Sequence, residues 1–255
     1  MQHTKTIIIT GASSGIGKSA AYRFAKEGYQ LILTARRQDR LLALQQELAD
    51  LYQTKSQLLC FDIQNLDEVK QAVASIDKTQ FPTIDILLNN AGLAAGMCTI
   101  DAGEYDDWNT MIDTNVKGLL YMSREVIPMM KEQGFGHIIN ISSTAAKDVY
   151  LNGNVYCATK HAVDALSKSM RIDLLPHAIK VTAINPGACE TEFSLVRFKG
   201  DTERAGNVYN GYQPLTPHDV ADAVYYCASM PPHVCINDLT LTCTAQANAL
   251  YTHKK

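Results

Sequence analysis

The segment KTIIITGASSGIG, residues 5–17, decides the fold. Its β-branched run over residues 5–10 predicts a buried strand, and the apolar residues after the glycines recur at helical spacing. A strand, a glycine-rich turn and a helix in this order are typical of the first unit of a nucleotide-binding α/β fold. The spacing G-x-x-x-G-x-G is a weak signal by itself, and the alternative is a turn that only connects two elements.

The glycines of this turn predict a phosphate site. They allow the backbone to turn sharply and leave amide groups free at the start of a helix, where the helix dipole favours anions. The residues that we expect to hold a dinucleotide here are Gly11, Ser13, Ser14, Gly15, Ile16 and Gly17.

Strands and helices alternate along the rest of the chain. The pattern predicts further strands over residues 30–34, 57–61, 84–88, 137–141, 180–185 and 235–242. It predicts further helices over residues 38–51, 65–78, 104–133, 155–175 and 216–228. In the first of these, the expected apolar side carries Leu41, Leu42, Leu44 and Leu48. This alternation indicates an α/β fold with a parallel sheet and right-handed crossovers. Residues 190–213 are polar and aromatic and contain glycines, which predicts a lid over a pocket.

The composition fits one globular domain spanning residues 1–255. The chain is 46% hydrophobic and 19% charged, and its net charge of -3 offers no basic surface for nucleic acid or for an acidic membrane. No apolar run suits a signal peptide or a membrane span, so we expect a cytoplasmic protein. The seven cysteines are scattered without C-x-x-C spacing, which predicts reduced packing residues and no metal site.

The second predicted strand ends in two arginines, Arg36 and Arg37, where an NAD-binding unit would present an acid to the ribose hydroxyls. A guanidinium group binds a 2′-phosphate in a planar, charge-assisted way. The sequence therefore favours NADP over NAD, and the alternative is a solvated pair at the sheet edge. Asp62 and Ile63 follow the third strand and fit an adenine, one as hydrogen-bond acceptor and one as apolar cover. The alternative for Asp62 is a cap of the next helix, and the two roles are compatible.

Small residues follow two more strands of the predicted sheet. The first of these segments is N-N-A-G at residues 89–92. Its asparagine amides can tie the backbone of a neighbouring strand together, while the alanine and glycine leave space for a ribose and nicotinamide. We expect the nicotinamide end of the cofactor to contact Asn90, Ala91, Gly92, Pro186, Gly187, Cys189 and Thr191. Cys157 and Cys189 fall beside candidate functional stretches, and we interpret both as small packing thiols.

The stretch GHIINISSTAAKDVYLNGNVYCATK, residues 136–160, carries the candidate chemistry. Tyr156 and Lys160 are four residues apart, so a helix places the phenol and the ammonium group on one face. A nearby cation should lower the tyrosine pKa toward neutrality, which would let the phenol exchange protons. Ser143 follows an apolar strand and should emerge at the carboxyl edge of the sheet. The alternative is a chance Y-x-x-x-K on a helix surface.

The predicted helix over residues 104–133 is apolar around more than one face, and a neighbouring subunit is the simplest cover for the surplus. Asn115 lies within it. A buried amide without a partner is costly, so Asn115 should bind a water or a backbone group.

Together, T-G-x-x-x-G-I-G at residues 10–17, N-N-A-G, Asn115, Ser143 and the Y-x-x-x-K pair resemble the short-chain dehydrogenase/reductase family over nearly the whole chain. The resemblance implies a doubly wound Rossmann-type sheet of about seven strands, a bound NAD(H) or NADP(H), and Asn115, Ser143, Tyr156 and Lys160 as catalytic residues.

Three later segments are similar to one group of this family, the NADP-dependent 3-hydroxy acid dehydrogenases: TEFSLVRFKGD, PLTPHDVADAV and PPHVCINDL. This group, also described as serine or L-allo-threonine dehydrogenases and malonic semialdehyde reductases, implies short 3-hydroxy acid substrates and a homotetramer. One departure is C-T-A-Q at residues 243–246, where the group tends to have a proline.

The expected reaction is hydride transfer between NADP(H) and a short 3-hydroxy acid. Ser143 would hold the substrate oxygen, Tyr156 would exchange its proton, and Lys160 would hold the nicotinamide ribose. Asn115 would position a water that carries the proton outward. Arg197, inside the expected lid, is a candidate for the substrate carboxylate or an ordinary lid or subunit contact. The alternatives are a reductase of a 3-oxoacyl thioester, steroid or xenobiotic ketone, and a non-enzymatic NADP-sensing protein.

Overall fold

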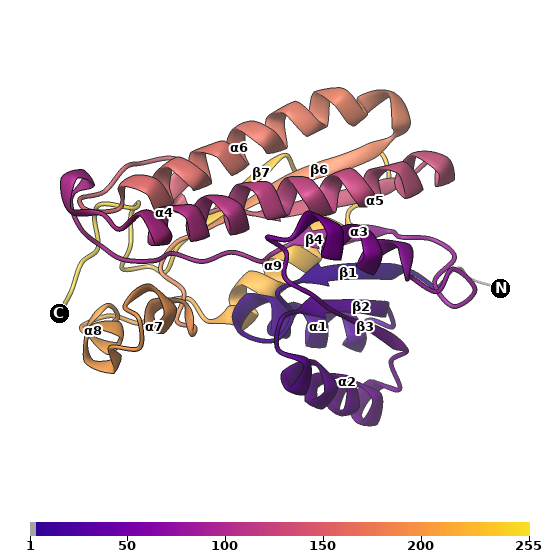
Figure 1. Ribbon diagram of the computed structural model, residues 1–255, viewed down its shortest axis with the longest axis horizontal. Helices are drawn as coiled ribbons and strands as arrows, with labels where there is room; N and C mark the ends of the chain where they lie inside the picture. Colours follow the sequence, from indigo (N-terminus) through magenta and orange to yellow (C-terminus); the bar gives the residue numbers. More distant parts are fainter. Residues whose placement is uncertain (1–3) are drawn as a thin grey trace.

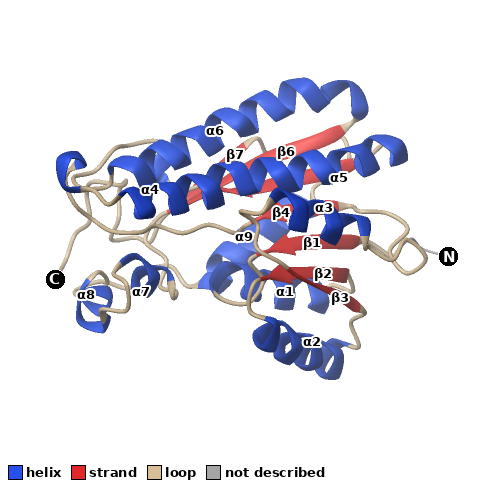
Figure 2. Ribbon diagram, viewed as in Figure 1, coloured by secondary structure: helices blue, strands red, loops and turns tan. Residues whose placement is uncertain are grey.

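The computed structural model describes residues 4–255, which form a seven-stranded sheet with the order β3-β2-β1-β4-β5-β6-β7. All neighbouring strands are parallel. The strands are β1 (Thr6–Thr10), β2 (Gln30–Ala35), β3 (Ser56–Cys60), β4 (Ile86–Asn89), β5 (Gly136–Ile141), β6 (Ile179–Pro186) and β7 (Asp238–Leu241). The predicted doubly wound α/β fold with about seven strands is confirmed (Figures 1 and 2).

Helices cover both faces of the sheet. The described helices are α1 (Gly15–Lys26), α2 (Gln38–Tyr52), α3 (Leu66–Ala74), α4 (Tyr105–Ile112), α5 (Leu119–Gln133), α6 (Asn154–Leu174), α7 (Phe193–Arg197), α8 (Thr202–Asn207) and α9 (Pro217–Ser229). Helices α1, α2 and α9 supply one buried apolar cluster, and α3, α5 and α6 supply a second on the opposite face. Figure 1 shows α5 and α6 running side by side along the second face.

The β1 run is apolar without interruption because the strand is buried on both faces. Ile7 and Ile9 belong to the cluster of α1, α2 and α9, whereas Ile8 belongs to the cluster on the other face. All three side chains are fully buried. Successive side chains of a strand point to opposite faces, so one short run contributes to both cores.

Strand β1 lies inside the sheet, between β2 and β4. Strand β2 pairs with one side of β1 and β4 with the other, so the strand order reverses at this point. In open parallel sheets, ligands bind in the crevice outside the carboxyl ends of the strands at such a reversal. Helices α7 and α8 lie beyond these carboxyl ends, apart from the sheet (Figure 1).

Three helix predictions need correction. Helix α3 ends at Ala74 and not near residue 78, because the Asp77 side chain accepts hydrogen bonds from Thr79 and forms a turn. Leu42 was expected on the apolar side of α2 but is 51% exposed. The predicted helix over 104–133 is interrupted between α4 and α5 by a π-helical turn, η2 (Asp113–Gly118). π-helical turns are rare in proteins, and those that occur often lie at functional sites.

His137 is buried within β5. Its Nε2 lies 2.7 Å from the Thr182 hydroxyl, and its Nδ1 has no hydrogen-bond partner among the described residues. Burial lowers the pKa of His137 to about 3, with a smaller contribution from Lys180. The ring is therefore neutral at pH 7.

We expect His137 to make the fold sensitive to acid. The unfolded chain takes up a proton near pH 6.5 and the folded chain only near pH 3, so stability is lost as pH falls from about 6.5 toward 3. The loss approaches about 1.4 kcal/mol per pH unit within this window. Urea unfolding at pH 7, 6 and 5 should give a shallower decline for His137→Gln than for the wild type. The exposed His233 offers the control His233→Gln, and an equal decline in all three proteins would contradict this account.

No helix among residues 4–255 is both long and apolar enough to cross a membrane.

Candidate active site

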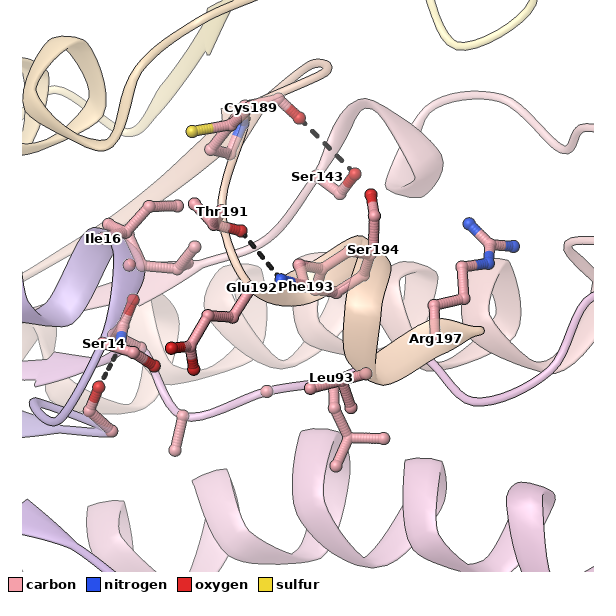
Figure 3. Close-up of a pocket in the computed structure, with 18 of the residues that line it drawn as sticks. Ser14, Ile16, Leu93, Ser143, Cys189, Thr191, Glu192, Phe193, Ser194 and Arg197 are labelled. Carbon is pink, nitrogen blue, oxygen red and sulfur yellow. Dashed lines mark hydrogen bonds between the residues drawn. The ribbon is translucent and has the colours of Figure 1, made fainter. Parts of the chain in front are cut away.

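A cavity of about 530 Å³ lies at the carboxyl ends of the strands. It extends from Arg36 and Asp62 at one end to Arg197 and Val208 at the other. Every predicted site residue lines this cavity except Gly17 and Asn115, which lie behind its wall. Figure 3 shows residues of the glycine turn, Ser143 after β5 and residues of the α7 segment around the same space.

The glycine turn has the shape of a phosphate cradle. Gly11 and Gly15 adopt φ of +67° and +53°, a region that favours glycine. A Cβ on Gly17 would lie 2.4 Å from the Gly11 carbonyl oxygen and 2.5 Å from the Asn90 Nδ2. Helix α1 begins after Ser14 with no side-chain cap and no acidic residue in its first turn. Its first amide groups therefore remain available to an anion.

The N-A-G segment after β4 is fixed to β1. The Thr10 hydroxyl accepts hydrogen bonds of 2.9 Å from the backbone amides of Asn90 and Ala91. The Asn90 Nδ2 donates to the Thr10 carbonyl at 2.8 Å. A Cβ on Gly92 would lie 3.5 Å from the Lys160 Nζ. The expected tie between the asparagine amide and the neighbouring strand is present, and Ala91 and Gly92 line the cavity.

Two arginines lie at the end of the cavity beside the glycine turn. Arg37 donates from Nη2 to the hydroxyls of Ser13 at 3.1 Å and Ser14 at 3.0 Å. Arg36 is exposed, and its Nη1 lies 3.7 Å from the Asp62 carboxylate. Asp62 also accepts from the Gln64 amide, whereas the side chain of Asn65 caps α3. The capping alternative for Asp62 is therefore wrong.

The opposite part of the cavity brings the three predicted reactive side chains together. Ser143 caps a short 3₁₀ turn, accepting from the Ala145 amide at 3.1 Å and donating to the Pro186 carbonyl at 3.5 Å. Tyr156 and Lys160 lie one turn apart on α6. The Lys160 Nζ donates to the Ile141 carbonyl at 3.0 Å and lies 5.9 Å from the centre of the Tyr156 ring.

The expected lowering of the Tyr156 pKa is wrong. Burial raises the pKa above its usual value, and the neighbouring Tyr150 raises it further. A hydrogen bond with Ser143 and the charge of Arg197 lower it by less. Burial also lowers the pKa of Lys160 to about 8. At neutral pH, Tyr156 is therefore a phenol that has a proton to give.

The Asn115 side chain serves the backbone of Leu93. Its Oδ1 accepts from the Leu93 amide at 2.9 Å, and its Nδ2 donates to the Leu93 carbonyl at 2.8 Å and to Thr159 at 3.1 Å. Of the two partners expected for this amide, the backbone group is the one found. Asn115 thus connects η2 to a segment of the cavity wall and to α6.

Arg197, at the end of α7, reaches the cavity beside Tyr156. Its Nη1 donates to the Tyr150 hydroxyl at 2.9 Å, and its guanidinium carbon lies 5.7 Å from the centre of the Tyr156 ring. Its backbone carbonyl accepts from the Gly96 amide at 3.0 Å. The residue is therefore both a contact between the α7 segment and the chain after β4 and a cation at the reactive end of the cavity.

The cavity wall after β6 is anchored by Gln246. Its Oε1 accepts from the Ala188 amide at 2.7 Å, and a Cβ on Gly187 would lie 2.1 Å from that oxygen. Pro186, Cys189 and Thr191 line the cavity next to this contact. Burial raises the pKa of Cys189 to about 12, so its thiol is neutral. The sequence prediction did not include Gln246, although it lies in the segment that departs from the expected group.

This geometry agrees with comparisons to known proteins. A family model described as short chain dehydrogenase matches residues 5–200. The chain belongs to the short-chain dehydrogenase family. It is 46% identical over 244 residues to the NADP-dependent 3-hydroxy acid dehydrogenase of Salmonella typhi, covering 95% of this chain and 96% of the relative.

Two further proteins of this family are similar over most of their length. The serine 3-dehydrogenase of Agrobacterium fabrum is 44% identical over 236 residues, covering 92% of each chain. A closed form of serine dehydrogenase complexed with NADP+ superimposes with a TM-score of 0.91 at 44% identity, covering 98% of this chain and all of that one. The family resemblance inferred from the sequence is confirmed.

Besides Gln246, three further residues at the site were not predicted from the sequence: Tyr150, Arg40 and Glu192. Tyr150 is the partner of Arg197. Arg40, in the first turn of α2, donates to the Glu192 carboxylate at 2.7 Å, and Arg37 lies 3.2 Å from the same carboxylate. Arg40 is three residues after Arg37, and both lie near one end of α2. This spacing could have indicated that Arg40 lies beside Arg37.

Proposed function

We propose that the protein is an NADP-dependent oxidoreductase that transfers a hydride between NADP(H) and a short 3-hydroxy acid or its semialdehyde. The observation that carries this proposal is the placement of Ser143, Tyr156 and Lys160 in the same cavity as the glycine turn. The similar proteins named for NADP, 3-hydroxy acids and serine support the choice of cofactor and substrate class.

The cavity residues fit NADP. The uncapped start of α1 and the glycine turn suit the pyrophosphate, and Arg36 and Arg37 suit a 2′-phosphate. Asp62 and Ile63 would hold the adenine, and Lys160 the nicotinamide ribose. The wall residues that would contact the nicotinamide end are Asn90, Ala91, Gly92, Pro186, Gly187, Cys189 and Thr191. When bound, the cofactor supplies or accepts the hydride.

The protein's own residues handle the proton. Ser143 holds the substrate oxygen, and Tyr156 donates a proton to it during reduction or takes one during oxidation. The raised pKa of Tyr156 suits the donor role at neutral pH. Lys160, with a pKa of about 8, keeps a positive charge beside the phenol at pH 7 and stabilises the phenolate left after donation. Asn115 acts as a positioning residue, because its amide is used by Leu93 and Thr159.

Arg197 is the proposed partner of the substrate carboxylate. Two of its five N–H groups reach Tyr150 and Gly96, and the guanidinium group faces the cavity next to Tyr156. A hydrogen bond between a guanidinium group and a carboxylate changes the binding affinity by roughly tenfold to hundredfold.

We expect Arg197→Ala to raise the KM for serine by about thirtyfold, because the carboxylate loses a charged partner. Steady-state kinetics with saturating NADP+ would measure this change. Arg204, a second lid arginine that lies over Phe198 and does not line the cavity, provides the matched control Arg204→Ala. A KM that changes equally in both variants would reject the assignment.

The reaction itself is tested by NADPH oxidation. Malonic semialdehyde should be reduced faster than an acetoacetyl thioester, and serine and 3-hydroxypropionate should be oxidised with NADP+. Faster reduction of the thioester or of a steroid ketone would identify a different carbonyl reductase. NADP(H) binding without turnover of any of these substrates would identify a sensing protein.

We also propose that the protein is cytoplasmic and assembles as a homotetramer. Each subunit is one domain, in which residues 190–213 form a lid. Exposed apolar side chains on consecutive helices support association, among them Ile112, Leu120 and Ile172. The two short helices α7 and α8 within residues 190–213 support the lid. Light scattering of the purified protein would measure the oligomeric state.

A further inference from the structure

The Glu192 carboxylate is bound by Arg37 and Arg40, at the end of the cavity beside the glycine turn. Arg40 donates to its two oxygens from Nη1 at 2.7 and 3.0 Å, and Arg37 donates from Nη1 at 3.2 Å. These contacts lower the pKa of Glu192, Arg40 contributing most. Glu192 is therefore an anion held by two guanidinium groups.

The same guanidinium group of Arg37 contacts the glycine turn. Its Nη2 and Nε reach the Ser13 hydroxyl, and Nη2 also reaches Ser14. A 2′-phosphate at this end of the cavity would need the planar donors that Glu192 engages. Figure 3 shows Glu192 directed toward Ser14, on the side of α7 away from Arg197.

Glu192 also belongs to the lid and directly precedes α7. In that helix, Phe193 packs edge-on against Tyr156 with ring centres 5.5 Å apart. Arg197 ends the helix and donates to Tyr150. One five-residue helix thus connects the arginine pair to the residues around the reactive phenol.

We propose that Glu192 is an internal competitor for the 2′-phosphate subsite, and that a 2′-phosphate binding to Arg37 displaces the Glu192 carboxylate and releases the amino-terminal end of the lid. This inference rests on the proposed NADP function. Glu192 then determines coenzyme affinity without contacting the coenzyme, and it links occupancy of the phosphate subsite to the position of α7. A coenzyme that lacks the 2′-phosphate leaves the Glu192 carboxylate bound to Arg37 and Arg40.

The test uses the full chain and two nucleotides that carry no nicotinamide. Adenosine 2′,5′-bisphosphate presents the additional phosphate, and adenosine 5′-monophosphate does not. Titration calorimetry at low salt should show that Glu192→Gln binds the bisphosphate about fivefold more tightly than the wild type, while its affinity for the monophosphate is unchanged. Glu190, exposed in the same lid, provides the matched control Glu190→Gln, which should behave as the wild type.

Hydrogen exchange over residues 193–197 gives a second readout. The bisphosphate should accelerate exchange in the wild type, and Glu192→Gln should exchange fast without any nucleotide. Equal or weaker bisphosphate binding by Glu192→Gln would overturn the inference, because Glu192 would then be neutral or would help to orient the arginines. If the wild type prefers the bisphosphate and Glu192→Gln does not change this preference, only the inference fails. If the wild type shows no preference, the NADP proposal fails with it.

Discussion

Tyr156→Phe should lower kcat about a thousandfold at pH 7, because the ring remains and only the exchangeable proton is lost. The phenol is 8% exposed and is packed by Phe193, so a phenylalanine fits the same space without rearrangement. NADPH oxidation with malonic semialdehyde measures the loss, and NADPH binding measured by fluorescence should stay within twofold of the wild type.

Tyr150 provides the matched control for this substitution. It is a second tyrosine of the same cavity, and its hydroxyl accepts from Arg197. Tyr150→Phe removes a hydroxyl that orients Arg197, so we expect a raised KM with kcat changed by less than about threefold. Turnover of Tyr156→Phe within tenfold of the wild type would remove Tyr156 from the proton transfer.

Gly17→Ala should abolish measurable NADP binding and lower the free energy of unfolding by about 3 kcal/mol. The added Cβ would meet the Gly11 carbonyl at 2.4 Å and the Asn90 Nδ2 at 2.5 Å. Neither group can move freely, since Gly11 has a positive φ and Asn90 is held by Thr10. Coenzyme titration and urea unfolding measure the two effects.

A glycine in open space separates this clash from the general effect of an added methyl group. Gly206 lies in α8, and a Cβ there would meet no atom within 4 Å. Gly206→Ala should leave stability unchanged or slightly higher, because alanine restricts the unfolded chain. Normal NADP binding by Gly17→Ala would show that the turn adjusts and that its close packing is not required.

The sheet and most of the cavity could be predicted from the sequence because local patterns specify them. The β-branched run before Gly11 identifies β1, and the alternation of strands and helices identifies a parallel sheet. In such a sheet the carboxyl ends of the strands share one edge. Residues that follow separate strands, such as Arg37, Gly92 and Ser143, therefore had to lie near one another.

The proton affinity of Tyr156 could not be predicted from its spacing to Lys160. The spacing gives a shared helix face, which the structure has, but the pKa depends on what covers the phenol. Phe193 and Tyr150 come from segments whose path the sequence pattern does not specify. The same limit applies to Glu192 and Arg40, which are 152 residues apart and meet only because of the path taken by the lid.

Because of the π-helical turn η2, the segment from α4 to α5 is constrained in its length more than in its composition. Each residue of a helix adds about 100° of rotation, so deleting one residue within η2 would turn α4 by that angle relative to α5. Asn115 would then leave Leu93, and Met111 would leave the buried cluster around Ala94 and Tyr156. Over evolutionary time this segment should accept few insertions or deletions.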